Sequence, residues 1–273
     1  MFYVSSSRFS AFGLGKNNDS IFYMEKPNTP MRYKENSWDE GTSVVRVMYD
    51  LKERIKPIVE TLKEGIENDQ YGMVLGVDAS GRVPALVLAR LIQYKRNIEI
   101  RFVTGNKNVD NEDSLVRLDE LKGHFSTEEF RGQLGDREVL IVDDIIASGF
   151  SLELICRALK EVSLRYKVIG LAHEKSKTSA SKEAVMERLE ADILIGGEGD
   201  QFSGEYPEIY GKHQMAGIKK GVGMFSKSIH KTELDAQAGG NLYYPKQNQK
   251  VLQRTRELVN RTAHQLAEEI GWA

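Results

Sequence analysis

Two adjacent aspartates, Asp143 and Asp144, end an apolar run at residues 139–142. Because neighbouring carboxylates repel each other, we expect this site to bind a group that stabilises their ionised form. Sugar hydroxyl groups donate hydrogen bonds to carboxylates, and a divalent cation favours both ionised side chains. The pair therefore indicates a site for a sugar diol, a divalent cation, or both together.

A turn of small residues follows the two aspartates and leads into a predicted helix. It consists of Ala147, Ser148, Gly149, Phe150 and Ser151. Small residues let backbone N–H groups form a concave nest, the helix adds the positive end of its dipole, and the two serines add hydroxyl donors. This turn predicts a phosphate site. With a sugar diol bound beside it, the implied ligand is a ribose 5-phosphate group.

An earlier stretch at residues 76–89, GVDASGRVPALVLA, has the character of a second anion site. It contains Ala79, Ser80, Gly81 and Arg82. Ser80 and Gly81 would let backbone amides approach a pyrophosphate closely, and Arg82 would neutralise part of its charge. We therefore predict that residues 79–82 bind a pyrophosphate.

Short apolar runs alternating with helical segments would position these motifs. The runs lie at residues 73–77, 98–103, 139–143, 167–172 and 192–196. Nearly continuous apolar strands of this kind predict an α/β fold, with a central parallel sheet flanked by helices on both faces. In such sheets ligands bind beyond the carboxyl ends of the strands, where all three motifs would lie.

The flanks of this alternating region predict additions to a central core. We expect a core at residues 70–198, an N-terminal arm and helix at 1–69, and a C-terminal extension at 199–273. Apolar residues at helical spacing predict one helix from Ser43, kinked or divided at Pro57, and a last helix at residues 249–270.

The stretch VLIVDDIIASGFS at residues 139–151 resembles the thirteen-residue phosphoribosyl pyrophosphate (PRPP) motif of the type I phosphoribosyltransferases. The stretch at 76–89 resembles the pyrophosphate loop of that family, in the form found in its xanthine- and adenine-type members. The resemblance implies a type I phosphoribosyltransferase-like core with N- and C-terminal additions, in which residues 1–69 are a candidate hood.

The resemblance also implies an activity and roles for particular residues. The chain would use PRPP and Mg²⁺ to transfer a 5-phosphoribosyl group to a nitrogenous base or related acceptor, releasing pyrophosphate. Asp143 and Asp144 would bind the ribose and, through the ligand or water, the metal, and residues 147–151 would bind the 5-phosphate. The catalytic set would be Arg82, Lys107, Asp143 and Asp144, with Lys107 on a mobile loop at roughly 104–133.

The resemblance implies a homodimer.

Four residues are candidates for contact with the acceptor: His173, Phe202, Tyr206 and Tyr210. His173 would lie on the loop after the fourth strand, whereas the aromatic residues could instead form the core of a small subdomain.

Several alternatives to these assignments remain open. The aspartates could cap a strand end, or bind magnesium in a different α/β fold, and Arg82 could be a surface arginine paired with a helix carboxylate. The alternative function is a non-catalytic regulator of the same fold that senses PRPP or a nucleotide.

Composition limits the classes of partner. The formal net charge is -2 and the isoelectric point is about 6.3, which gives no electrostatic basis for binding nucleic acid or an anionic membrane. No apolar run approaches the roughly 18 residues of a membrane span, and the amino terminus lacks a signal-peptide pattern. We expect a cytoplasmic protein with small-molecule ligands, in which the single cysteine, Cys156, is a buried thiol.

Overall fold

The computed structural model of the chain describes residues 43–78, 81–104, 112–174, 180–199, 229–230 and 245–273. The chain divides into two compact units, Met1–Ser43 and Val44–Ala273, and the second contains every described residue except Ser43. The helices are α1 (Ser43–Glu67), α2 (Arg82–Ile92), α3 (Glu112–Phe125), α4 (Glu128–Leu134), α5 (Phe150–Glu161), α6 (Lys182–Leu189) and α7 (Pro245–Glu269). The strands are β1 (Tyr71–Asp78), β2 (Glu99–Thr104), β3 (Glu138–Ile146), β4 (Tyr166–Glu174), β5 (Ile193–Ile195), β6 (Glu198–Gly199) and β7 (Ile229–His230).

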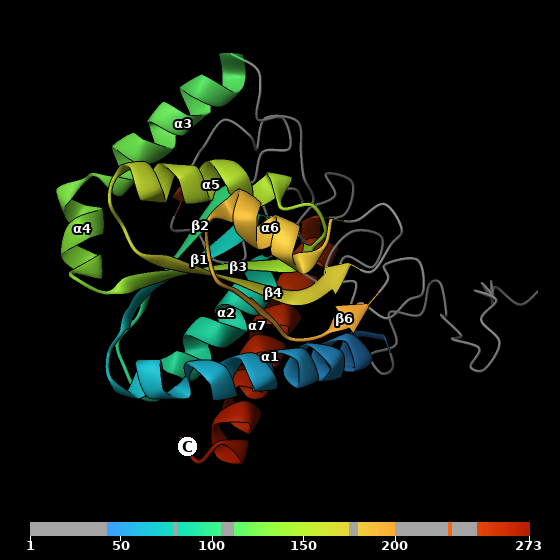
Figure 1. Cartoon of the computed structure of the whole chain (residues 1–273). Coiled ribbons are helices and arrows are strands. Elements are labelled where there is room, and N and C mark those ends of the chain that lie inside the picture. The colour runs from blue at the N-terminus through green and yellow to red at the C-terminus, as the bar shows by residue number, and fades with distance from the viewer. Residues whose placement is uncertain (1–42, 79–80, 105–111, 175–179, 200–228, 231–244) are drawn as a thin grey trace, which may run out of the picture. The chain divides into compact units, whose positions relative to one another are not determined.

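The strands form one sheet in the order β5-β4-β3-β1-β2-β7, and β6 pairs with the end of β4 (Figure 1). Strands β1 to β6 run parallel, and β7 pairs antiparallel with β2. Each apolar run identified in the sequence overlaps one of the strands β1 to β5. The prediction of a central parallel sheet flanked by helices is confirmed.

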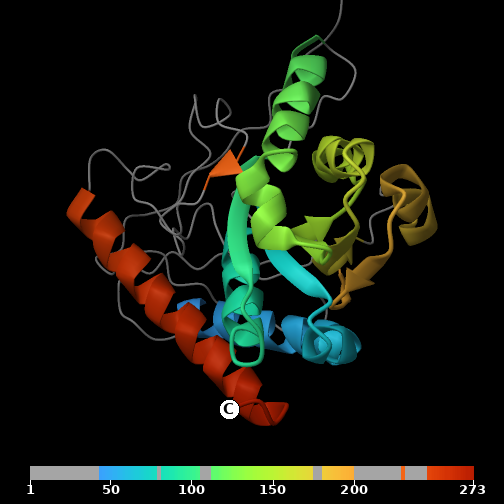
Figure 2. The same ribbon diagram turned by 90° about the vertical axis from the view of Figure 1, so that its left-hand side faces the viewer.

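Helices cover both faces of the sheet (Figures 1 and 2). On one face α1, α2 and α7 pack with strand residues such as Val74, Leu140 and Ile169. On the other face the helices from α3 to α6 pack with strand residues such as Met73 and Ile141. Successive strand residues alternate between the two faces, so a sheet covered on both sides requires apolar residues at nearly every strand position.

Helix α1 is continuous from Ser43 to Glu67, with Pro57 inside it. The prediction that Pro57 divides the helix is therefore wrong. Pro57 lies on the exposed side of the helix, where water can bond the carbonyl group that the missing proline N–H leaves without its donor. The buried side consists of Leu51, Ile55, Ile58, Val59, Leu62 and Ile66, each at most 2% exposed.

Helix α7 runs from Pro245 to Glu269 and completes the apolar layer that contains α1 and α2. Its buried residues include Leu258, Val259 and Leu266. Glu269 pairs with Lys52 at 2.6 Å and with Lys56 at 3.1 Å, both on α1. Both α1 and α7 lie outside the range 70–198, yet they supply one side of the apolar core.

The segment after β2, expected to be a long mobile loop, contains helices α3 and α4. Of this segment, residues 105–111, which include Lys107, lie outside the described residues. Lys122 on α3 pairs with Asp119 at 2.9 Å and with Glu161 at 3.1 Å. Arg131 on α4 donates to the Val162 carbonyl oxygen at 2.6 Å. The expectation of one long loop is therefore wrong for α3 and α4, which pack in the same layer as α5.

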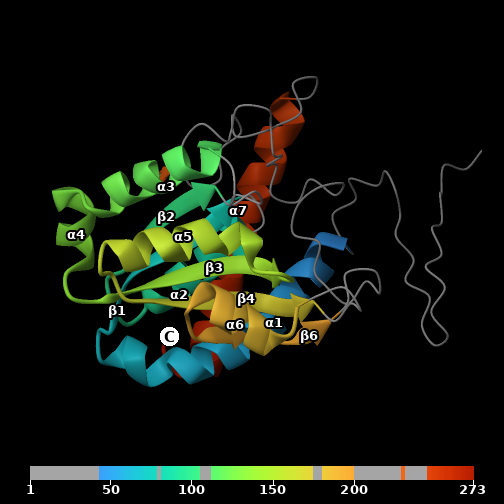
Figure 3. The ribbon, with the colours of Figure 1, turned by 45° about the horizontal axis from the view of Figure 1, so that its top comes forward.

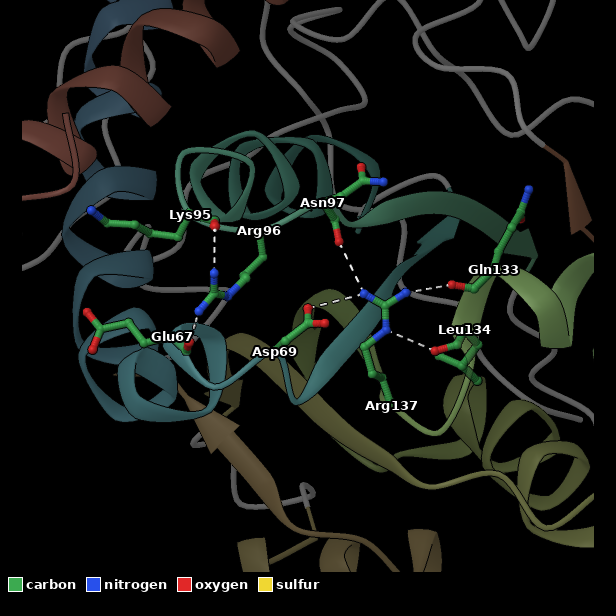
Figure 4. Close-up of polar contacts among 8 residues, drawn as sticks. All are labelled: Glu67, Asp69, Lys95, Arg96, Asn97, Gln133, Leu134 and Arg137. Carbon is green, nitrogen blue, oxygen red and sulfur yellow. Dashed lines mark hydrogen bonds and ion pairs between the residues drawn. The ribbon is translucent and has the colours of Figure 1, made fainter.

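The turns at the amino ends of the strands are joined by Arg137 (Figure 4). Its guanidinium donates to the carbonyl oxygens of Leu134 at 3.0 Å, Gln133 at 2.8 Å and Asn97 at 3.4 Å. It also bonds the Asp69 carboxylate at 3.2 Å. One side chain thus connects the turns before β1, β2 and β3.

We expect Arg137→Met to lower the free energy of unfolding by about 1–3 kcal/mol, because it leaves the two partly buried carbonyl oxygens of Gln133 and Leu134 without a donor. Urea denaturation followed by circular dichroism measures the loss. The matched control is Arg157→Met, which removes an exposed i,i+4 pair with Glu161 and should cost less than about 0.5 kcal/mol. Equal losses in the two variants would contradict the role assigned to Arg137.

Candidate functional site

The carboxyl ends of β1 and β3 meet at the point where the strand order reverses. β1 is followed by α2 in one helix layer, whereas β3 is followed by α5 in the other layer. Neighbouring strands whose chains leave toward opposite faces open a crevice between the two turns, and such crevices are the usual ligand sites of parallel sheets. The two predicted anion-binding motifs follow these two strands.

Gly81 brings the turn after β1 into contact with β3. A Cβ atom on Gly81 would lie 2.2 Å from the Val142 carbonyl oxygen and 2.9 Å from the Val77 carbonyl oxygen. The Gly81 amide also donates to the Val77 carbonyl oxygen at 2.7 Å, which closes a tight turn before α2. Since Val142 directly precedes Asp143, the structure places Gly81 beside the backbone that leads into the acidic pair.

Asp143 and Asp144 lie inside β3 and are 5% and 8% exposed. The Asp144 amide donates to Asp143 Oδ1 at 2.9 Å, and the Ile145 amide donates to Asp144 Oδ1 at 2.7 Å. Both are bonds from the backbone of the following residue within β3. The contact of these two carboxylates with a sugar diol stays a prediction.

The turn after β3 has the backbone geometry that the phosphate prediction requires. Gly149 adopts a left-handed conformation, with φ of 80°, and is the N-cap of α5 without a side-chain cap. A Cβ atom here would meet Val185 of α6 at 3.0 Å, and the left-handed φ would strain any L side chain. The N–H groups of Phe150 and Ser151 belong to the first turn of α5 and so face the amino end of that helix.

The side chain of Phe150 packs away from this nest, against α6. The Arg188 guanidinium lies 4.0 Å from the Phe150 ring centroid, and Arg188 also pairs with Glu153 at 3.5 Å. Figure 3 shows α5 and α6 on the same side of β3 and β4. A phosphate at this turn would therefore be bound by the backbone of Phe150 and not by its ring.

Arg82, the first residue of α2, is fully buried. Its guanidinium carbon lies 4.4 Å from the centroid of the Phe102 ring, which stabilises the cation by its quadrupole. The alternative that Arg82 is a surface arginine is therefore wrong. Its contact with a pyrophosphate stays a prediction, as do the contacts of Ala79 and Ser80, which lie outside the described residues.

His173 lies within β4, which continues to Glu174, so the prediction of a loop position was wrong. It pairs in register with Ile146, the residue before the phosphate turn, and is 8% exposed. Its Nε2 atom is buried and has no hydrogen-bond partner within the described part of the chain. Glu174, the next residue, is also 8% exposed. Apolar periodicity did not predict that β4 carries two buried polar residues at its carboxyl end.

Other predicted site residues lie outside the described ranges: Lys107, Phe202, Tyr206 and Tyr210. Within those ranges, no group of three or more His, Cys, Asp or Glu residues could hold a metal ion.

No helix of the described segments has the length and apolar character of a membrane span. Cys156 is buried, as predicted. Burial raises the pKa of its thiol, and the negative charge of the nearby Glu153 raises it further, so the thiol stays protonated.

Comparison with known proteins matches a family model, the phosphoribosyl transferase domain, to residues 47–193. This range includes residues 79–82, the acidic pair and the phosphate turn, but not α7. A search of curated proteins found no match.

Solved structures with a similar fold include a purine phosphoribosyltransferase from Pyrococcus horikoshii Ot3, at 16% identity and a TM-score of 0.35, covering 56% of this chain and 84% of that one. An orotate phosphoribosyltransferase from Francisella tularensis is 13% identical at a TM-score of 0.35, with 70% and 90% covered. A hypothetical protein from Neisseria gonorrhoeae with bound ppGpp is 19% identical at 0.34, with 56% and 80% covered.

We expect Gly81→Ala to separate the turn after β1 from β3, because a methyl group cannot occupy a point 2.2 Å from a carbonyl oxygen. The loss of unfolding free energy should be at least about 2 kcal/mol, in the range of severe overpacking. Gly132→Ala is the control, because nothing lies within 4 Å of a Cβ atom there. Thermal and urea denaturation of both variants measure the difference, and a Gly81→Ala protein as stable as the control would contradict this contact.

Proposed function

The chain belongs to the phosphoribosyl transferase domain family, and we propose that it transfers the 5-phosphoribosyl group of PRPP to a nitrogen atom of a small acceptor. The observation that supports this most directly is the contact of Gly81 with β3. It brings a turn suited to pyrophosphate beside the acidic pair, which is followed by a turn suited to phosphate. PRPP carries the three matching groups, a pyrophosphate, a diol and a 5-phosphate, on one ribose.

In the proposed complex the two turns and the acidic pair fix the sugar between its charged substituents. The carboxylates of Asp143 and Asp144 accept hydrogen bonds from the ribose hydroxyl groups. Backbone N–H groups of residues 147–151 bind the 5-phosphate, and those of residues 79–82 bind the pyrophosphate. The contribution of the protein is then positioning and electrostatic stabilisation, without a covalent enzyme intermediate.

The reaction exchanges one bond at C1 of the ribose. The C1–O bond to pyrophosphate breaks and its electron pair leaves with the pyrophosphate oxygen, while the acceptor nitrogen forms a bond to C1 and loses a proton. Positive charge develops on the ring oxygen and C1 in the transition state, and the two nearby carboxylates stabilise it.

The residues present fit a magnesium ion that is bound together with its substrate. Mg²⁺ keeps several waters and binds to one or two carboxylates plus substrate phosphates, and Asp143 and Asp144 supply carboxylates at the required edge of the sheet. Bound there, Mg²⁺ would neutralise charge on the leaving pyrophosphate.

We expect the double variant Asp143→Asn with Asp144→Asn to weaken PRPP binding by at least about 100-fold, because hydrogen bonds to charged groups contribute about 1.5–3 kcal/mol each. Asparagine keeps the Oδ1 acceptor, so the bonds from the amides of Asp144 and Ile145 survive and the strand end should fold.

Calorimetric titration of PRPP with Mg²⁺ measures this loss, and Asp119→Asn on the exposed surface of α3 is the control. Unchanged affinity in a folded double variant would show that the acidic pair does not hold the ribose.

Release of pyrophosphate in the presence of purine, pyrimidine and nicotinate-type acceptors tests the transfer step itself. We expect release with at least one acceptor, abolished by a chelator in excess and restored by added Mg²⁺. PRPP that binds tightly but yields no pyrophosphate with any acceptor would identify the chain as a sensor of PRPP.

A further inference from the structure

The backbone of the phosphate turn depends on how the first turn of α5 is held. Gly149, the N-cap of α5, has a left-handed φ of 80° and provides no side-chain cap. The direction of the N–H groups of Phe150 and Ser151 is therefore set by the helix itself. A contact that fixes this end of α5 also fixes the direction of these donors, on which affinity for a phosphate depends.

One face of α6 packs on this end of α5 (Figure 3). This face consists of Val185, Arg188 and Leu189, at positions i, i+3 and i+4 of the helix. A Cβ atom on Gly149 would lie 3.0 Å from Val185 Cγ1 and 3.5 Å from Leu189 Cδ2. The Arg188 guanidinium carbon lies 4.0 Å from the centroid of the Phe150 ring. Helix α6 thus contacts both the backbone of the turn and the first side chain of α5.

Hydrogen bonds fix α6 itself at both ends. At its amino end the Ala184 amide donates to Ser181 Oγ at 3.2 Å. At its carboxyl end the Tyr166 hydroxyl group, from β4, donates to the Leu189 carbonyl oxygen at 3.0 Å. The Arg188 side chain therefore extends toward α5 from a helix that is fixed to the sheet.

Arg188 also lies beside a negative charge that would oppose a bound phosphate. Glu153 is in the first turn of α5, where a carboxylate stabilises the free helix but repels an anion at the same helix end. Its Oε2 atom lies 3.5 Å from Arg188 Nη1 and makes no hydrogen bond within the described part of the chain. The contact between the two groups is therefore one of charge, and the guanidinium offsets the repulsion of a phosphate by Glu153.

We propose that Arg188 is a positioning residue for the 5-phosphate, because it holds the first turn of α5 through Phe150 and neutralises the Glu153 carboxylate beside the turn. Arg188 acts through these two residues of α5 and makes no contact with the ligand in this assignment. The inference rests on the proposed function, in which residues 147–151 bind the 5-phosphate. It extends the phosphate site from one turn of consecutive residues to a second helix.

Calorimetric titration of ribose 5-phosphate into the full chain tests this role. Arg188→Met should weaken binding about tenfold, because it removes the contact with the Phe150 ring and leaves the Glu153 charge uncompensated. Arg188→Lys keeps the charge without the planar group, so it should lose only about threefold. The matched control is Arg157→Met, which removes an arginine paired with Glu161 at 2.8 Å in the carboxyl half of the same helix, and should leave the affinity unchanged.

Further measurements distinguish this role from a general loss of helix packing. Adding Glu153→Gln to Arg188→Met removes the repelling charge and should restore the affinity to within about threefold of the wild type. The deficit of Arg188→Met should also shrink at high ionic strength, because salt screens the Glu153 charge. Pyrophosphate with Mg²⁺, which the turn after β1 is proposed to bind, should titrate equally into the wild type and Arg188→Met.

The outcomes separate this inference from the proposed function. An Arg188→Met protein that binds ribose 5-phosphate as tightly as the wild type would overturn the role of Arg188 alone. So would a double variant no better than Arg188→Met, or an equal loss of affinity for pyrophosphate. A wild-type protein that binds neither ribose 5-phosphate nor PRPP would overturn the proposed function as well.

Discussion

The close contact between the turn after β1 and the backbone of β3 is the constraint on which the site depends. It requires glycine at position 81, because any side chain would occupy the space of the Val142 carbonyl oxygen. The consequence concerns the proposed site as well as the fold, since Gly81 comes to lie next to the strand that carries the acidic pair and leads into the turn proposed to bind phosphate.

Glycine also permits a close contact at the carboxyl end of β5. Gly196 and Gly197 let α1 pack directly on the chain after β5, which brings the Arg54 side chain to the carboxyl edge of the sheet. Helix α1 is itself stabilised by α7 through Lys52, Lys56 and Glu269. Since α7 lies outside the matched family domain, the C-terminal extension contributes to the core that supports the site.

Amino-acid periodicity was sufficient to predict the sheet, because a strand buried on both faces must be apolar at almost every position. The same reasoning was insufficient for residues 112–134, because the many charged side chains there obscured the apolar periodicity of helices α3 and α4. There the buried side is held by few residues, such as Phe125, Phe130 and Leu134. Polar composition alone did not distinguish an amphipathic surface helix from a loop.

By itself the sequence determined the order of three candidate binding motifs along the chain: a turn suited to pyrophosphate, an acidic pair and a turn suited to phosphate, each defined by local residue types. Only the tertiary structure decided that Arg82 is buried against Phe102, that His173 belongs to a strand, and that Arg54 reaches the same edge. The physical reason is that backbone nests depend on neighbours in the chain, whereas burial and side-chain convergence depend on contacts between residues far apart in the sequence.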